Sequence, residues 1–242
     1  VDGEQVRIGS AHFIFEDEKV TIPEGEQAKF DALPPEYSQL YLAIEGVLSA
    51  VICISDPLRE EAKDVLSALR GLGVKNAVML TGDSPRTAAA IAAQLGVDDF
   101  QAGVLPADKA DYVAALRREG HTVLMVGDGI NDSPALSEAD AGIAISDGAA
   151  IAREIADITI AADSLWELVR LRQLAMALMH RIQNNYRFVI GFNGVLIGLG
   201  VAGILPPATS AMLHNLSTLG VSLHSMSALP VAGRETKVVK DL

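Results

Sequence analysis

The feature that most constrains the fold is the ten-residue sequence VGDGINDSPA at residues 126–135. The apolar residues 122–126 predict a short buried strand, and the residues after the glycine turn can start a helix. Asp128 and Asp132 are therefore expected at the carboxyl end of a strand, where open α/β sheets bind ligands. Gly-Asp-Gly alone is common in surface turns, but the flanking strand and helix favour a ligand site. Two carboxylates with the amide oxygen of Asn131 between them suit Mg²⁺.

Strand and helix patterns alternate through the middle of the chain, which predicts an α/β fold with a doubly wound parallel sheet. Strands are expected at 77–80, 122–126, 141–145 and 158–160, helices at 57–72, 85–95, 107–118 and 133–139, and a further short unit at 149–155. Before this region, the expected elements are a hairpin in residues 1–15, loops with one short helix in 16–38, and two strands in 40–55 that turn at Glu45-Gly46.

Three further loops supply groups that bind phosphate. Thr81-Gly82-Asp83 follows an apolar strand and precedes a helix, so the Thr81 hydroxyl and nearby amides can hold phosphate oxygens. Asp56 and Arg59 stand at the start of another helix, and Lys109 begins the helix that leads to the central strand. Each group alone has an ordinary structural explanation, as a helix cap or a surface charge. Together they form the set that phosphoryl transfer needs, because that reaction depends on positioning and on neutralising charge.

The charge is unevenly divided along the 242 residues, whose net charge is -12. Residues 181–242 carry 2 of the 31 acidic side chains and 5 of the 19 basic ones, so the acidic excess lies before residue 181. With no basic stripe, the sequence does not indicate nucleic-acid binding. The single Cys53 excludes an internal disulfide framework.

The interval between Arg187 and Arg234 contains no Asp, Glu, Lys or Arg. It divides at Pro206-Pro207, so we expect two transmembrane helices, at 188–205 and 208–229, as a hairpin with both ends in the cytoplasm. A pair of buried helices in a soluble domain is the alternative. A long helix from Ser164 is expected to join the α/β region to the first span.

The successive motifs resemble those of the P-type cation-transporting ATPases, within the haloacid dehalogenase-like superfamily. The two closing spans make the chain similar to the heavy-metal branch. The matching segments are VRIGS at 6–10, DPLR at 56–59, TGD at 81–83, PADK at 106–109, VGDGINDSPAL at 126–136 and EADAGIAI at 138–145.

The resemblance implies that ATP phosphorylates an aspartate and that hydrolysis of the aspartyl phosphate drives a metal through the membrane. It implies Mg²⁺ binding by Asp128, with Asn131 and Asp132 ordering the phosphate and metal shell. It implies phosphoryl binding by Thr81 and Lys109. It also implies that nucleotide binding, including the loop that supports it, involves Gly9, Asp56, Arg59, Gly82 and Asp83.

The phosphorylated motif Asp-Lys-Thr-Gly-Thr does not occur in the sequence, nor does a Cys-Pro-Cys metal motif. We therefore expect a carboxyl-terminal fragment of a pump that is inactive by itself. Its expected domains are the end of a nucleotide-binding domain (1–38), a phosphorylation domain (39–163), a linker helix (164–187), the two spans and a cytoplasmic tail (230–242). The expected location is a plasma (inner) membrane, with membrane lipid as a partner and the α/β domain in the cytoplasm.

The second expected span carries candidates for the transported ion. His214 and Thr218 share one helix face, and Asn193 in the first span matches another polar position of the family. Imidazole, hydroxyl and amide groups suit Mn, Co or Zn better than Cu(I), although Met212 and Met226 leave copper open. Helix-to-helix hydrogen bonding by the same polar residues is an equal alternative.

A second class of function remains open from the sequence. A membrane-anchored, phosphatase-like or non-catalytic regulatory protein would use the same Mg²⁺ and phosphate groups without transport. An upstream segment carrying the phosphorylation motif would favour the pump.

Overall fold

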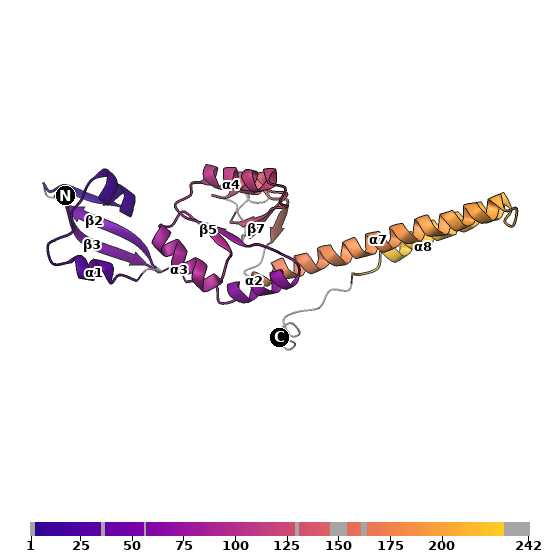
Figure 1. Ribbon diagram of the computed structural model, residues 1–242, viewed down its shortest axis with the longest axis horizontal. Helices are drawn as coiled ribbons and strands as arrows, with labels where there is room; N and C mark the ends of the chain where they lie inside the picture. The colour runs from indigo at the N-terminus through magenta and orange to yellow at the C-terminus, as the bar shows by residue number, and fades with distance from the viewer. Residues whose placement is uncertain are drawn as a thin grey trace. The chain divides into compact units, whose positions relative to one another are not determined.

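The computed structural model describes residues 3–34, 37–55, 57–128, 131–145, 154–160 and 164–229 (Figure 1). The chain divides into two compact units, Val1–Leu165 and Trp166–Leu242. Each unit is described by itself.

The first unit begins with an antiparallel sheet of three strands in the order β1-β2-β3. These strands are β1 (Val6–Gly9), β2 (Ser38–Ile44) and β3 (Val47–Ile54). The expected turn between β2 and β3 is confirmed: Glu45 and Gly46 have φ of 50° and 77°, and two left-handed residues suit a two-residue hairpin turn.

The hairpin expected in residues 1–15 is wrong. β1 pairs with β2, and residues His12–Asp17 form a π-helix. The physical reason is burial: the helical turn brings Ile14, which is 0% exposed, under the sheet. A local hairpin would have left that side chain without a core.

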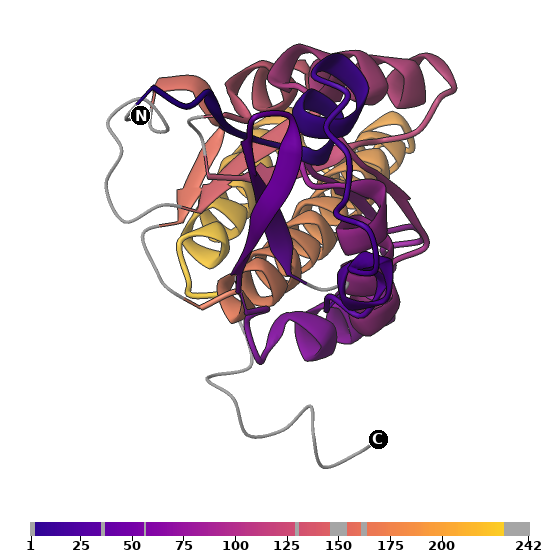
Figure 2. The ribbon, with the colours of Figure 1, turned by 90° about the vertical axis from the view of Figure 1, so that its left-hand side faces the viewer.

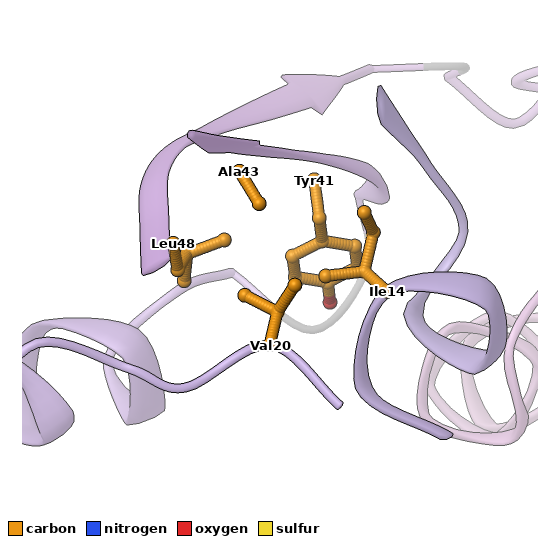
Figure 3. Close-up of a cluster of buried hydrophobic side chains, with 5 residues drawn as sticks. All are labelled: Ile14, Val20, Tyr41, Ala43 and Leu48. Carbon is orange, nitrogen blue, oxygen red and sulfur yellow. The ribbon is translucent and has the colours of Figure 1, made fainter. Parts of the chain in front are cut away.

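Five side chains form the core of this sheet, and Figure 3 shows them pointing toward one another. Tyr41 and Ala43 come from one face of β2, and Ile14 and Val20 pack from the segment between β1 and the short helix α1 (Gln27–Asp31). Phe15 and Phe30 contact the ring of Tyr41, with centroids 5.1 and 6.0 Å away. This core fixes the start of β2.

Parallel strands follow, so the α/β prediction is confirmed, although within the described residues they form two separate parallel sheets and not one doubly wound sheet. β4 (Val78–Leu80) pairs with β5 (Asp99–Gln101), and β6 (Leu124–Gly127) and β8 (Ile158–Ile160) flank β7 (Ala141–Ile145). The sequence did not predict β5, whose three residues Asp-Phe-Gln lack an apolar run. The unit expected at 149–155 lies largely outside the described residues.

The expected helices of this region are also present. They are α2 (Ala62–Gly71), α3 (Pro85–Leu95), α4 (Pro106–Arg118) and α5 (Ser133–Glu138). Buried alanine and valine side chains, such as Ala88 in α3 and Val113 in α4, pack these helices. Each parallel strand therefore has a helix that starts close to its carboxyl end or leads to its amino end.

Three aspartates mark the amino ends of the parallel strands. Asp98, Asp140 and Asp157 stand immediately before β5, β7 and β8. Each accepts a hydrogen bond of 2.8 Å from a backbone N–H of the neighbouring strand segment: Ala77 for Asp98, Val123 for Asp140 and Gly142 for Asp157. Each carboxylate thus adds one hydrogen bond to the backbone hydrogen bonds that join its pair of strands.

The second unit contains α7 (Trp166–Val201) and α8 (Pro207–Ser225), which lie side by side (Figures 1 and 2). The Arg181 guanidinium in α7 donates to the carbonyls of Ser225, Ser227 and Ala228 at the end of α8. These bonds satisfy carbonyl groups that a helix end leaves without partners.

The two transmembrane helices expected at 188–205 and 208–229 are not found. Within the described residues, no helix is at once long and apolar enough to span a membrane. The expected linker and first span are one helix, which ends at Val201 and so has only residues 188–201 beyond Arg187. The apolar character of α8 is diluted by polar side chains, including His214 and Asn215.

Candidate functional site

The candidate site is built at the carboxyl ends of β4 and β6. Gly127 ends β6, Asp128 follows it, and Asp132 is the residue before the first turn of α5. The carboxylate Oδ1 of Asp128 accepts a 3.4 Å bond from the backbone N–H of Asn131. Asp128 and Asn131 are exposed, so their oxygens face solvent at the edge of the sheet.

Lys109 forms an ion pair with Asp132. Its Nζ lies 2.7 Å from Oδ1 of Asp132, and the two side chains are only 13% and 14% exposed. Lys109 lies in the first turn of α4, where Pro106 suits the helix start and Asp108 Oδ2 accepts from the N–H of Leu105. The start of α4 therefore holds an ammonium group over the loop that follows β6.

Gly127 is required by the close approach of Asp132. A Cβ at position 127 would lie 2.4 Å from Oδ2 of Asp132 and 2.7 Å from its Cβ. The Asp132 side chain therefore packs over a strand end that has no side chain of its own. This contact and the bond to Lys109 fix the carboxylate in one place.

The loop after β4 holds the Thr81 hydroxyl. Thr81 Oγ1 donates to Oδ2 of Asp83 at 2.7 Å and accepts from the N–H of Asp83 at 3.1 Å. β5 supports the loop, since the N–H of Thr81 donates to the carbonyl of Gln101. Ser84 then caps α3 by accepting from the N–H of Thr87. The amino end of α3 is thus ordered directly beside the hydroxyl.

The predicted nucleotide residues are more scattered. Arg59 is exposed and lines a cavity of about 360 Å³ with Glu60, Glu61 and Asp64. None of these four residues belongs to the loops that follow β4 and β6. Asp56 lies outside the described residues. Gly82 is exposed, with Val104 O alone within 4 Å of a Cβ built there.

Gly9 occupies a different part of the first unit, in β1. A Cβ at this position would lie 2.4 Å from the Phe13 ring, so the glycine is needed for packing. This packing role accounts for a glycine here without a ligand.

The donor chemistry around β6 fits Mg²⁺. Within the described ranges no group of three or more His, Cys, Asp and Glu side chains could hold a metal by itself. Mg²⁺ does not need such a group, because it keeps several waters and commonly uses one or two carboxylates together with substrate phosphate. Asp128 offers an exposed carboxylate, and Asp132 forms the ion pair with Lys109.

The second unit brings together two of the three residues predicted to contact a transported ion. His214 Nδ1 in α8 lies 2.8 Å from Oδ1 of Asn193 in α7. The Thr218 hydroxyl instead donates to the carbonyl of His214, within its own helix. Two ligands of one ion could lie this close together, and a hydrogen bond between the two helices would give the same His214–Asn193 contact.

Ser38 was missed by the sequence analysis. Its hydroxyl donates to Oδ1 of Asp83 at 2.8 Å, across 45 residues of sequence. A serine at the start of a strand carries no local signal of such a contact. Only the packing of β2 near the loop after β4 reveals it.

Comparisons with known proteins identify the family and similar folds. The sequence profile of the haloacid dehalogenase-like hydrolases matches residues 3–140. The chain is 39% identical over 93% of its length to a manganese-exporting P-type ATPase of Mycobacterium leprae and 40% identical over 83% to copper-transporting ATPase 1 of Rhizobium meliloti. It covers 31% and 24% of those two proteins.

A solved structure is similar over almost the whole chain. The crystal structure of a zinc-transporting PIB-type ATPase in the E2.Pi state matches 93% of this chain and 36% of its own, with a TM-score of 0.73 and 32% identity. The chain thus spans about a third of the length of the proteins it resembles. Those proteins are named for manganese, copper and zinc, so similarity alone does not select an ion.

Proposed function

Because the chain belongs to the haloacid dehalogenase-like hydrolase family, we propose that it forms the phosphoryl-binding part of a P-type ATPase that transports a heavy-metal cation. The observation that carries the proposal is the Lys109–Asp132 ion pair packed over Gly127. The proposed pump works through an aspartyl phosphate. The 242 residues contain no Asp-Lys-Thr-Gly-Thr, so its nucleophile lies in another segment of the pump and this chain alone is inactive.

The chain's own residues hold the phosphoryl group. The Lys109 ammonium neutralises a phosphoryl oxygen, and Asp132 keeps that ammonium in place through its 2.7 Å bond. The Thr81 hydroxyl donates to a second oxygen. Phosphoryl transfer needs little more from a protein than such positioning and charge neutralisation.

Asp128 and Asn131 are the proposed holders of Mg²⁺, with Asp132 ordering the shell around it. Bound there, Mg²⁺ supplies positive charge that neutralises the transferred phosphoryl group. The nucleotide is ATP, and its proposed contacts are Gly9, Asp56 and Arg59. Gly82 and Asp83 keep the loop around Thr81 in shape.

The proposed cargo is a divalent ion, with Mn, Co or Zn ahead of Cu. The residue types of His214 and Asn193 support this order, because imidazole nitrogen and amide oxygen suit borderline and hard ions. Thr218 is the third proposed ligand. Metal-stimulated ATPase activity of the whole pump that responds only to Cu(I) would reverse the order.

A plasma (inner) membrane is the proposed location, with the α/β unit in the cytoplasm. Exposed aliphatic side chains on both long helices support contact with membrane lipid; examples are Val195 at 59% and Ile197 at 67% exposed in α7 and Leu223 at 60% in α8. The proposed nucleotide-binding segment is the amino-terminal part of the chain and extends through β3, since β1, β2 and β3 form one sheet, and the proposed phosphorylation domain follows it.

Binding of inorganic phosphate tests the proposal on this chain directly. In calorimetric titrations with Mg²⁺ present, Lys109→Met should weaken phosphate binding at least about tenfold, the effect expected for losing a hydrogen-bonded charge. Lys63→Met, at an exposed position of α2, is the matched control and should bind as the wild type does. Equal affinities for the two variants, or no binding by the wild type, would remove Lys109 from the site.

The same protein distinguishes the second class of function. A phosphatase-like protein would release p-nitrophenol from p-nitrophenyl phosphate, whereas the proposed pump segment should not. Hydrolysis that disappears in Lys109→Met would favour the phosphatase.

A further inference from the structure

One carboxylate connects the antiparallel sheet to the proposed phosphate loop. Oδ1 of Asp83 accepts from the Ser38 hydroxyl at 2.8 Å, and its Oδ2 accepts from the Thr81 hydroxyl at 2.7 Å. All three side chains are partly buried. Ser38, at the first position of β2, is thus linked to Thr81 through a single planar group.

The segment that leads to Ser38 is itself tied to the start of α3. Nη2 of Arg86 donates to two backbone carbonyls at the end of α1 and just after it, at 3.2 and 3.0 Å. The Thr87 hydroxyl donates to the carbonyl of Tyr37 at 3.3 Å, and Thr87 is only 4% exposed. These bonds hold Ser38 beside Asp83, so the contact is part of a packed junction.

The position of the Thr81 proton decides what that hydroxyl can do. A hydroxyl has one proton to donate, and here it points to Asp83. A phosphoryl oxygen must compete with the carboxylate for it. Ser38 makes Asp83 a weaker competitor, because its donated proton already satisfies part of the carboxylate's charge. It also fixes the plane of the carboxylate and with it the position of Thr81.

We propose that Ser38 is a positioning residue for phosphoryl binding, acting through Asp83 on the hydroxyl of Thr81. The inference rests on the proposed role of Thr81 in holding a phosphoryl oxygen. It adds a link from β2, the central strand of the antiparallel sheet, to the phosphate loop. A displacement of β2 that breaks the Ser38–Asp83 bond would make Asp83 a stronger competitor for the Thr81 proton. Thr81 would then bind a phosphoryl oxygen less well.

Phosphate titrations in the presence of Mg²⁺ test the inference. Ser38→Ala should weaken phosphate binding about two- to tenfold, the range that corresponds to the net free energy of one hydrogen bond. Ser38→Thr keeps the hydroxyl and should restore the affinity. Ser49→Ala is the matched control, since Ser49 is an exposed serine of β3 whose hydroxyl donates to the nearby carbonyl of Val47.

A double-mutant cycle separates positioning from a general loss of structure. In the Thr81→Val background, Ser38→Ala should change phosphate affinity less than twofold, because the group it positions is gone. Urea unfolding of each variant identifies any that is not folded. Should Ser38→Ala fail to fold, the same affinity comparison is made with Ser38→Gly and Ser38→Cys, with Ser38→Thr again as the rescue.

The outcomes for this inference and for the proposed function are distinct. If Thr81→Val binds phosphate as the wild type does, the proposed role of Thr81 fails. If Thr81→Val is weakened but folded Ser38→Ala is not, or if the Ser38→Ala loss is the same in both backgrounds, the positioning role of Ser38 is wrong.

Discussion

Aspartates stand at both ends of the parallel strands, and they differ in the groups that bond to them. At the amino ends, Asp98, Asp140 and Asp157 each accept from a backbone N–H of the adjacent strand segment, and Asp98 and Asp140 also accept from the side chains of Arg70 and Arg117. At the carboxyl ends, Asp83 and Asp132 accept from side chains of other elements, and Asp128 is exposed.

The difference separates structural carboxylates from chemical ones. A backbone N–H in a ladder cannot be given up without opening the sheet, so the amino-end oxygens are not available to a ligand. The hydroxyl and ammonium groups at the carboxyl ends sit on rotatable side chains that can turn to a phosphoryl oxygen. In the proposed function, the same residue type therefore serves the fold at one edge and the reaction at the other.

Two glycines in the neighbouring strands β6 and β7 give the largest expected contrast in stability. Gly142→Ala should lower the free energy of unfolding by about 1–3 kcal/mol, because its Cβ would lie 2.5 Å from the backbone oxygen of Leu136 and displace α5. Gly127→Ala would place its Cβ 2.7 Å from the Cβ of Asp132, so Asp132 must shift and phosphate binding is lost; stability should fall less, because the contact is with a side chain and not with the backbone of α5. Urea unfolding and phosphate titration of both variants measure the contrast. Equal unfolding midpoints with equal phosphate affinities would contradict it.

Asp128→Asn sharpens the comparison at the carboxyl edge. It should lower the contribution of Mg²⁺ to phosphate affinity about tenfold or more, because a neutral amide is a poorer ligand for a hard cation. Stability should stay the same or rise slightly, since an exposed negative charge is removed close to Asp132. Phosphate titrations with and without Mg²⁺ are the measurement. An unchanged Mg²⁺ effect would exclude Asp128 as a ligand.

The same substitution at the amino edge, Asp140→Asn, should give the smallest effect, and on stability alone. The pKa of Asp140 lies below its ordinary value because the N–H of Val123 donates to the carboxylate, with Arg117 adding to the shift against partial desolvation. A depressed folded-state pKa adds stability above the unfolded pKa of about 3.9, and this stability is lost as the pH falls through the folded value.

Urea midpoints of Asp140→Asn and the wild type should therefore differ modestly at pH 7 and converge as the pH falls below about 4. Phosphate affinity should be unchanged at pH 7. A difference between the midpoints that persists at low pH would mean that the variant has lost packing and not charge.

Much of the α/β region could be predicted because its signals are local. The glycine turn at Glu45-Gly46, the proline starts of α3 and α4 and the apolar runs of β6 and β7 all lie within a few residues of the elements they specify. The predicted helix 85–95 and strands 141–145 and 158–160 have the same bounds in the structure.

The failures of prediction have a common cause. β5 has no apolar run and is recognised only by its pairing with β4. The segment after β1 became a π-helix because Ile14 is buried against residues far along the chain. The limit expected between the linker helix and the first span, at residues 187 and 188, does not divide α7, because a helix continues through the charged Arg187 as readily as through apolar neighbours.

The sequence alone determined the family of the fold and predicted the chemical groups: Thr81, Lys109 and Asp128 with its neighbours stand in motifs whose residue types and spacing indicate them. Only the tertiary structure decided which atoms meet. The 2.7 Å pair of Lys109 with Asp132, the need for glycine at 127 and the bond of Ser38 to Asp83 all join elements distant in sequence. Such contacts depend on how helices and strands pack, and packing has no local signature in the chain.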